Sequence, residues 1–139
     1  MSKRRILFVC GRNAGRSQMA AAFFNQIADT KEISAMSAGL EPAPQVHPEV
    51  VDAMNEVGID LSQVKPVALT GRMQSETFFL VTLGCDERCP MIPPGRRADW
   101  ILADPHGQPP ERVREIRDEI RQLVTDLVTA KKWNKETTS

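Results

Sequence analysis

Cys10 and Arg16 are the residues whose types and spacing point most directly to chemistry. They lie in the stretch CGRNAGRS, with Gly11 and Gly15 between them and Ser17 directly after Arg16. A glycine-rich bend can bind an anion through its backbone N–H groups, and an arginine can bind two oxygens of one oxyanion. This positive potential favours a cysteine thiolate, to which Ser17 can hydrogen-bond. The pattern predicts nucleophilic attack by Cys10 on a tetrahedral oxyanion, although a single cysteine can also be a buried apolar side chain.

The sequence around this stretch alternates between strand and helix patterns. The expected strands cover residues 6–9, 33–39, 77–83 and, more weakly, 99–104, and the expected helices begin near Ser17, Pro48 and Val113. Continuous apolar runs are typical of parallel strands that are covered on both faces. We therefore predict a single α/β domain over residues 1–130: a four-stranded parallel sheet with helices on both faces and an anion-binding loop after the first strand. Residues 131–139 are expected to form a frayed tail.

Four reactive side chains lie at or after the ends of the expected strands. Cys10 ends the first strand, Cys85 and Cys89 follow the third, and Asp104 follows the fourth. Ligands of doubly wound sheets bind beyond the carboxyl ends of the strands. We therefore expect these side chains to lie at one edge of the sheet.

Composition limits the classes of partner. The 139 residues carry 18 basic and 18 acidic side chains, so bulk charge favours neither a nucleic acid nor a membrane surface. The opening apolar run is too short for a signal peptide, and no stretch approaches the roughly 20 apolar residues of a membrane span. We expect a cytoplasmic monomer whose three cysteines are thiols at rest.

Residues 10–17 resemble the signature loop of the low-molecular-weight protein tyrosine phosphatases and of the arsenate reductases that share their fold. The resemblance covers about residues 4–128 and continues through RSQMAAAFF, SAGLEPAPQVHPEVVDAMNEVGIDLS, LVTLGCDERCP and DWILADPHGQP. It implies a substrate-binding loop made of Gly11, Arg12, Asn13, Ala14, Gly15 and Arg16. Asn13 is expected to hydrogen-bond within this loop. Arg12, which replaces the family's usual glycine, is expected either to strengthen anion binding or to face solvent.

Two features favour a reductase over a phosphatase within this resemblance. The chain has no tyrosine to stack on an aryl phosphate, and its GCDERCP segment supplies two extra cysteines. The resemblance implies that Cys10 attacks arsenate, that Asp104 protonates the leaving hydroxide, and that Cys85 and Cys89 pass a disulfide to thioredoxin. No cofactor would be bound, phosphate and sulfate would compete with arsenate, and weak phosphatase activity would remain.

Three alternatives stay open. The protein could be a low-molecular-weight tyrosine phosphatase, a non-catalytic phosphocarrier, or a reductase that uses Cys10 alone with mycothiol and a mycoredoxin. His47 and His106 could join Cys85 and Cys89 in a zinc site, but one C-x3-C pair is a weak metal signal, and no metal is expected. The charged runs RRADW and ERVREIRDEIR are expected to be solvated surface.

Overall fold

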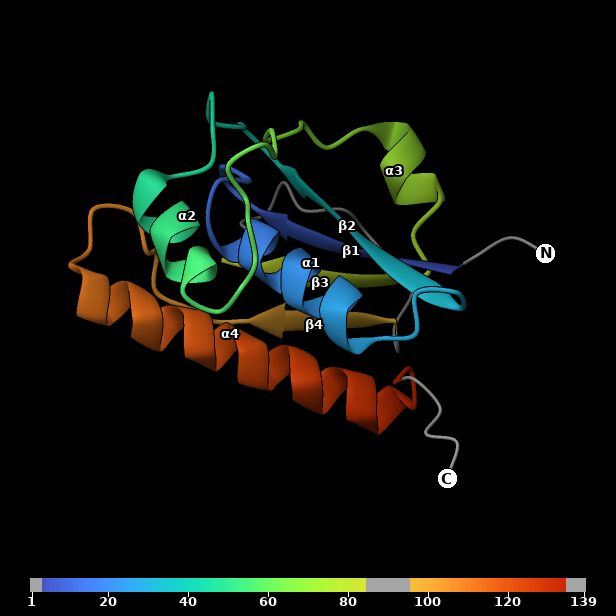
Figure 1. Ribbon diagram of the computed structural model, residues 1–139. Helices are drawn as coiled ribbons and strands as arrows, with labels where there is room; N and C mark the ends of the chain where they lie inside the picture. Colours follow the sequence, from blue (N-terminus) through green and yellow to red (C-terminus); the bar gives the residue numbers. More distant parts are fainter. Residues whose placement is uncertain (1–3, 85–95, 135–139) are drawn as a thin grey trace.

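The protein is built around a four-stranded parallel sheet. A computed structural model describes residues 4–84 and 96–134. The strands are β1 (Arg4–Cys10), β2 (Ile33–Gly39), β3 (Phe79–Leu83) and β4 (Arg97–Trp100), in the order β2-β1-β3-β4 (Figure 1). The strand β1, which leads into the predicted anion loop, therefore lies inside the sheet. The predicted α/β architecture is confirmed.

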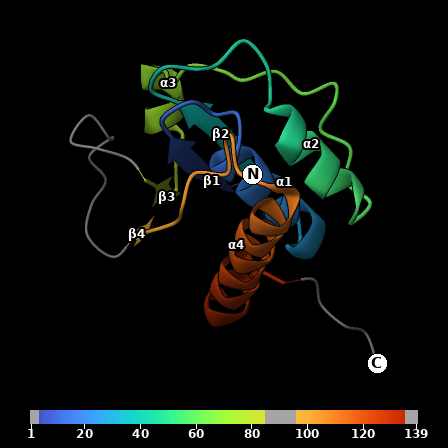
Figure 2. The same ribbon diagram turned by 90° about the vertical axis from the view of Figure 1, so that its left-hand side faces the viewer.

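Helices cover both faces of this sheet (Figures 1 and 2). They are α1 (Arg16–Ile27), α2 (Pro48–Asn55), the short α3 (Gly71–Ser75) and α4 (Pro110–Lys131). Because side chains alternate along a strand, Ile6 and Phe8 of β1 enter the larger core beneath α1 and α4, and Leu7 and Val9 enter a smaller one. Met73 of α3 packs against the smaller cluster. No sequence pattern predicted α3.

The fourth strand lies earlier than expected. It covers Arg97–Trp100, whereas the prediction placed a strand at 99–104 and treated residues 96–100 as solvated surface. Both expectations are wrong because this edge strand alternates: Ala98 and Trp100 pack against the larger core, and Asp99 is exposed. Thr82 Oγ1 donates to Asp99 Oδ1 at 2.6 Å, across to β3.

The long helix α4 also departs from a purely solvated charged surface. Its Arg117 is buried and donates from Nη1 to the carbonyl of Ala53 at 2.8 Å and to Glu56 at 2.9 Å. Arg114 binds the same carboxylate, and chiefly this hydrogen bond lowers the pKa of Glu56 to about 2. Two arginines of the charged run therefore join α4 to the residue that follows α2.

The packed domain extends beyond the expected boundary at residue 130. Trp133 is buried, its N–H donates to the Val128 carbonyl at 2.9 Å, and its own carbonyl accepts from Asp29 N–H at 2.8 Å. The frayed tail expected from residue 131 is therefore wrong as far as Asn134, which bridges to Ala28. No helix among the described residues is long and apolar enough to cross a membrane.

Candidate active site

The loop between β1 and α1 surrounds the Cys10 sulfur with hydrogen-bond donors. Cys10 is the last residue of β1, and only 2% of its surface is exposed. Its Sγ lies 2.9 Å from Ser17 Oγ in the first turn of α1, and the backbone N–H of Asn13 donates to it at 3.3 Å. A sulfur held at a helix N-terminus by two such groups can act as a nucleophile, because both groups can hydrogen-bond to a thiolate.

Asn13 holds this loop in shape. It has a φ of 51°, a left-handed conformation that asparagine tolerates better than most residues. Its buried amide Nδ2 donates to Ser17 Oγ at 2.8 Å, and its Oδ1 accepts from Gln18 Nε2 at 3.0 Å and from Val67 N–H at 2.9 Å. Asn13 therefore hydrogen-bonds within the loop, as predicted, and also joins the loop to a distant segment.

Gln18 is a residue of this site that the sequence analysis missed. Its side chain is buried and donates both to the backbone carbonyl and to the amide oxygen of Asn13, each at 3.0 Å. The available signal was a polar side chain directly after Ser17, in the first turn of the expected helix. That signal was weak, because glutamine is a common surface residue of helices.

Arg16 is the last residue of the loop, and its side chain lies between the segments that follow β3 and β4. Its side chain is 16% exposed, and Nη1 donates to the Leu102 carbonyl at 3.1 Å. Gly84, directly after β3, has a φ of +77°, and a Cβ there would collide with Arg16 Nη1. A glycine at position 84 therefore leaves the space that the guanidinium occupies.

The remaining loop residues divide by exposure. Asn13, Ala14 and Gly15 are buried, whereas Arg12 is exposed to solvent. A Cβ on Gly15 would lie 3.0 Å from Pro105 Cγ, whereas one on Gly11 would meet nothing within 4 Å. The loop is thus closely packed where the Asp104–Pro105 segment passes it.

Asp104 faces the site from an open position. Its Oδ2 lies 4.0 Å from Arg16 Nη2, but the side chain is 57% exposed. It is exposed because residues 101–104 leave the sheet after β4 instead of continuing the expected strand, and in this segment only Leu102 is buried. Asp104 Oδ1 accepts from His106 N–H at 3.0 Å, which orients the carboxylate.

The two histidines meet beside the loop. His47 N–H donates to the Ala14 carbonyl at 2.9 Å, and its ring stacks on that of His106 with centroids 4.0 Å apart. Burial, followed by the neighbouring His106, lowers the pKa of His47. The two cysteines predicted to act as a relay, Cys85 and Cys89, lie outside the described residues.

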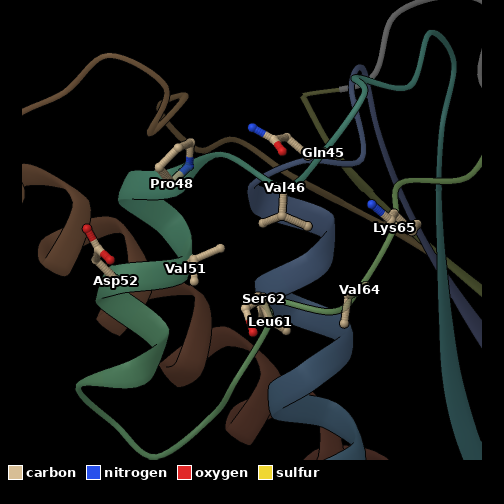
Figure 3. Close-up of a pocket in the computed structure, with 9 residues that line it drawn as sticks. All are labelled: Gln45, Val46, Pro48, Val51, Asp52, Leu61, Ser62, Val64 and Lys65. Carbon is tan, nitrogen blue, oxygen red and sulfur yellow. The ribbon is translucent and has the colours of Figure 1, made fainter.

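The structure also has a cavity of about 240 Å³ that is separate from this loop. It lies between α2, which contributes Val51 and Asp52, and residues 61–65 (Figure 3). None of residues 10–17 lines it, and neither does Asp104. The chemistry of the loop therefore takes place elsewhere.

Comparison with known proteins agrees with this geometry. Residues 5–138 match the sequence profile of the low molecular weight phosphotyrosine protein phosphatases. The chain belongs to this family. Within the family, it is 40% identical over 124 residues to a putative arsenate reductase of Halobacterium salinarum, covering 86% of this chain and 87% of that protein. It is 34% identical over 132 residues to arsenate reductase 2 of Staphylococcus haemolyticus, covering 93% and 99%.

A solved structure in the family has the same fold. The thioredoxin-dependent arsenate reductase of Corynebacterium glutamicum superposes with a TM-score of 0.80 at 32% identity. The superposition covers 94% of this chain and 62% of that longer chain. The two proteins therefore share their fold over nearly the whole of the present sequence.

Proposed function

We propose that this protein is an arsenate reductase in which Cys10 attacks arsenate bound by residues 11–16. The observation that carries the proposal is the buried Cys10 sulfur, held by Ser17 and by the Asn13 N–H in a loop whose Arg16 guanidinium lies 4.0 Å from Asp104. The relatives reported above support arsenate as the substrate, because they are named as arsenate reductases. The absence of tyrosine from the chain supports it further, because an aryl phosphate would find no phenol ring to stack on.

In the proposed reaction, the loop N–H groups and Arg16 hold the arsenate oxygens. The Cys10 thiolate forms a bond to arsenic, and one arsenic–oxygen bond breaks, with Asp104 protonating the departing oxygen. A second thiolate then attacks Cys10 Sγ. A sulfur–sulfur bond forms, the sulfur–arsenic bond breaks, and its electron pair stays on arsenic, which leaves as arsenite.

We further propose that Cys85 and Cys89 form the relay, with thioredoxin as the final reductant and no bound cofactor. The thioredoxin-dependent relative supports this route, which requires a reducing compartment such as the cytoplasm. The protein would act as a monomer. The competing route uses Cys10 alone with mycothiol and a mycoredoxin.

An NADPH-coupled arsenate assay, run in parallel with the thioredoxin system and with the mycothiol system, tests these routes. Wild-type protein should turn over with thioredoxin, and Cys10→Ser should lose all activity because a serine alkoxide is scarce at neutral pH. Protection of Cys10→Ser against heat by sulfate would confirm that its loop is still folded. Preferential hydrolysis of aryl phosphates by the wild-type protein would make it a phosphatase instead.

A single-turnover experiment tests the relay itself. One equivalent of arsenate without reductant should leave a Cys85–Cys89 disulfide, detected by mass spectrometry after free thiols are blocked. Cys89→Ser should stop with Cys10 bonded to Cys85 and release one arsenite per protein. Normal turnover of the double Cys85→Ser, Cys89→Ser variant with mycothiol would establish the competing route.

A further inference from the structure

Three side chains beside the loop form a cluster that the proposed reaction does not use. His47 precedes α2, Glu49 lies in its first turn, and His106 follows the Asp104–Pro105 segment. One donor atom from each lies within 4.8 Å of the other two, and His106 Nδ1 is 3.3 Å from Glu49 Oε1. The chain has only two histidines, far apart in sequence, and the fold brings both into this cluster.

We propose that His47, Glu49 and His106 bind a divalent transition-metal ion, for which Zn²⁺ is the reference. Two imidazoles and a carboxylate are a donor set that zinc accepts, with a fourth position left for water. The order of affinities among divalent metals places Cu²⁺ and Zn²⁺ ahead of Mn²⁺ for such nitrogen ligands, whereas Mg²⁺ and Ca²⁺ prefer oxygen.

The donor atoms need only a small rearrangement to surround an ion. Zinc–nitrogen bonds of about 2.1 Å in a tetrahedron place neighbouring donors about 3.4 Å apart. The two imidazole rings are stacked, so each ring must turn for its nitrogen to point at the ion. None of the three residues is buried, and the His106 side chain is 61% exposed, so this rotation meets little packing.

The backbones that carry the ligands are held in place. The His47 N–H bonds to the Ala14 carbonyl at 2.9 Å, and Pro48 restricts the chain between His47 and Glu49. Pro105, directly before His106, packs close to Gly15 of the anion loop. The ligand positions therefore come from two segments that both rest on the loop, which reduces the entropy lost when an ion joins them.

Local charge also permits a cation here. The carboxylates of Glu49 and Asp104 and the guanidinium of Arg12 all act electrostatically on His47. The N-terminus of α2 adds partial positive charge. Arg16 also lies 4.0 Å from Asp104, so two carboxylates face two guanidiniums, and Glu49 supplies a negative charge to the ion as a direct ligand.

Calorimetric titration with ZnCl₂ tests the site in untagged protein carrying Cys10→Ser, Cys85→Ser and Cys89→Ser. This background removes all three cysteine thiols that could bind zinc, and it cannot reduce arsenate, so the result does not depend on the proposed activity. We expect one zinc per chain. His47→Ala and His106→Ala should each weaken binding at least tenfold, and Glu49→Gln should weaken it less. Glu56→Gln, just after the other end of α2, is the matched control and should bind zinc as before.

Two-dimensional NMR of the imidazole nitrogens gives a second readout, because the only two histidines are both proposed ligands. Zinc should shift the signals of both rings together, at the stoichiometry found by calorimetry. Unchanged affinity in His106→Ala, or a shift of one histidine alone, would overturn the three-ligand site. Melting temperatures measured without metal show whether each variant is folded, and His106 is exposed enough for its replacement to be tolerated.

Discussion

The two sides of the anion loop, one around the Cys10 nucleophile and the other around the Asp104 acid, differ in burial. On the nucleophile side, Asn13 and Ser17 are fully buried, and their polar groups bond to each other and to Cys10. On the acid side, Asp104 is 57% exposed and approaches Arg16 at 4.0 Å. Hydrogen bonds in a low-dielectric interior fix geometry, whereas an exposed carboxylate is screened by water. The nucleophile is therefore preorganised before substrate binds, and the acid keeps free exchange of protons with solvent.

The largest effect is expected from Asn13→Ala on the buried side. Removal of the amide leaves Val67 N–H without its acceptor and removes a donor from Ser17, which should cost on the order of 3 kcal/mol of unfolding free energy. Urea unfolding measures the loss, and turnover should fall with it. Asn25→Ala is the control, because the Asn25 amide likewise both donates and accepts, in its case with the backbone of Ala35, but is exposed. Equal losses in the two variants would contradict the importance of burial.

Arg16→Lys should have the next largest effect, because Arg16 belongs to the loop and also lies near Asp104. Lysine cannot donate two parallel hydrogen bonds to an oxyanion, and a charge-assisted bond of about 1.5–3 kcal/mol corresponds to a roughly ten- to hundredfold loss of kcat/KM. Steady-state arsenate reduction measures this. Arg12→Lys, in the same loop but exposed, should change kcat/KM little. A comparable loss in Arg12→Lys would show that the exposed arginine also binds the anion.

Gly84→Ala should have a smaller, two-part effect. A side chain at a φ of +77° costs about 1 kcal/mol of stability, and its Cβ would also displace Arg16, lowering turnover about tenfold. Gly58→Ala separates the two parts, because Gly58 has a φ of +81° with nothing near its missing Cβ. Both variants should lose stability, but only Gly84→Ala should lose activity. Full activity in Gly84→Ala would show that Arg16 tolerates displacement.

Asp104→Asn should slow turnover by about tenfold. This loss is smaller than the rate factor that general acid catalysis usually contributes, because water can reach the same position and donate the proton. Sulfate should still raise the melting temperature of this variant, since the buried side of the loop is unchanged. If sulfate protection disappears, Asp104 acts mainly by holding Arg16. The comparison between the two sides would then need revision, with the exposed acid contributing to anion binding.

The smallest expected effect is the pH dependence of stability that comes from His47, whose N–H bonds to Ala14 and whose ring stacks on His106. Burial above all lowers its pKa below the ordinary 6.5, so the unfolded chain takes up this proton more readily than the folded one. Stability should therefore decrease as pH falls from 6.5 toward the folded-state pKa, and this dependence should vanish in His47→Gln. NMR titration of metal-free protein gives the pKa directly. A value at or above 6.5 would show that Glu49 and Asp104 outweigh burial.

Much of the fold could be predicted because its patterns are local. The residues of β2 were predicted at its observed bounds, and the apolar run of β1 and the periodic faces of α1 and α4 were also recognisable. The position of β4 was not, because its alternation is short and its charged residues resemble surface. The short α3 was missed for a similar reason, since five residues give no helical period.

The candidate site divides in the same way. The nucleophile side of the site is a short continuous segment that contains Cys10, Asn13, Arg16 and Ser17. Residue type and spacing alone therefore predicted that these residues share one loop and that Ser17 hydrogen-bonds to Cys10. Chain folding decides which distant segments surround that loop. Only the tertiary structure brings Val67 to Asn13 and Gly84 to Arg16, because these contacts join segments that lie far apart along the chain and carry no common periodic signal. It likewise stacks His47 on His106 and leaves Asp104 exposed, because burial depends on where two loops pass each other.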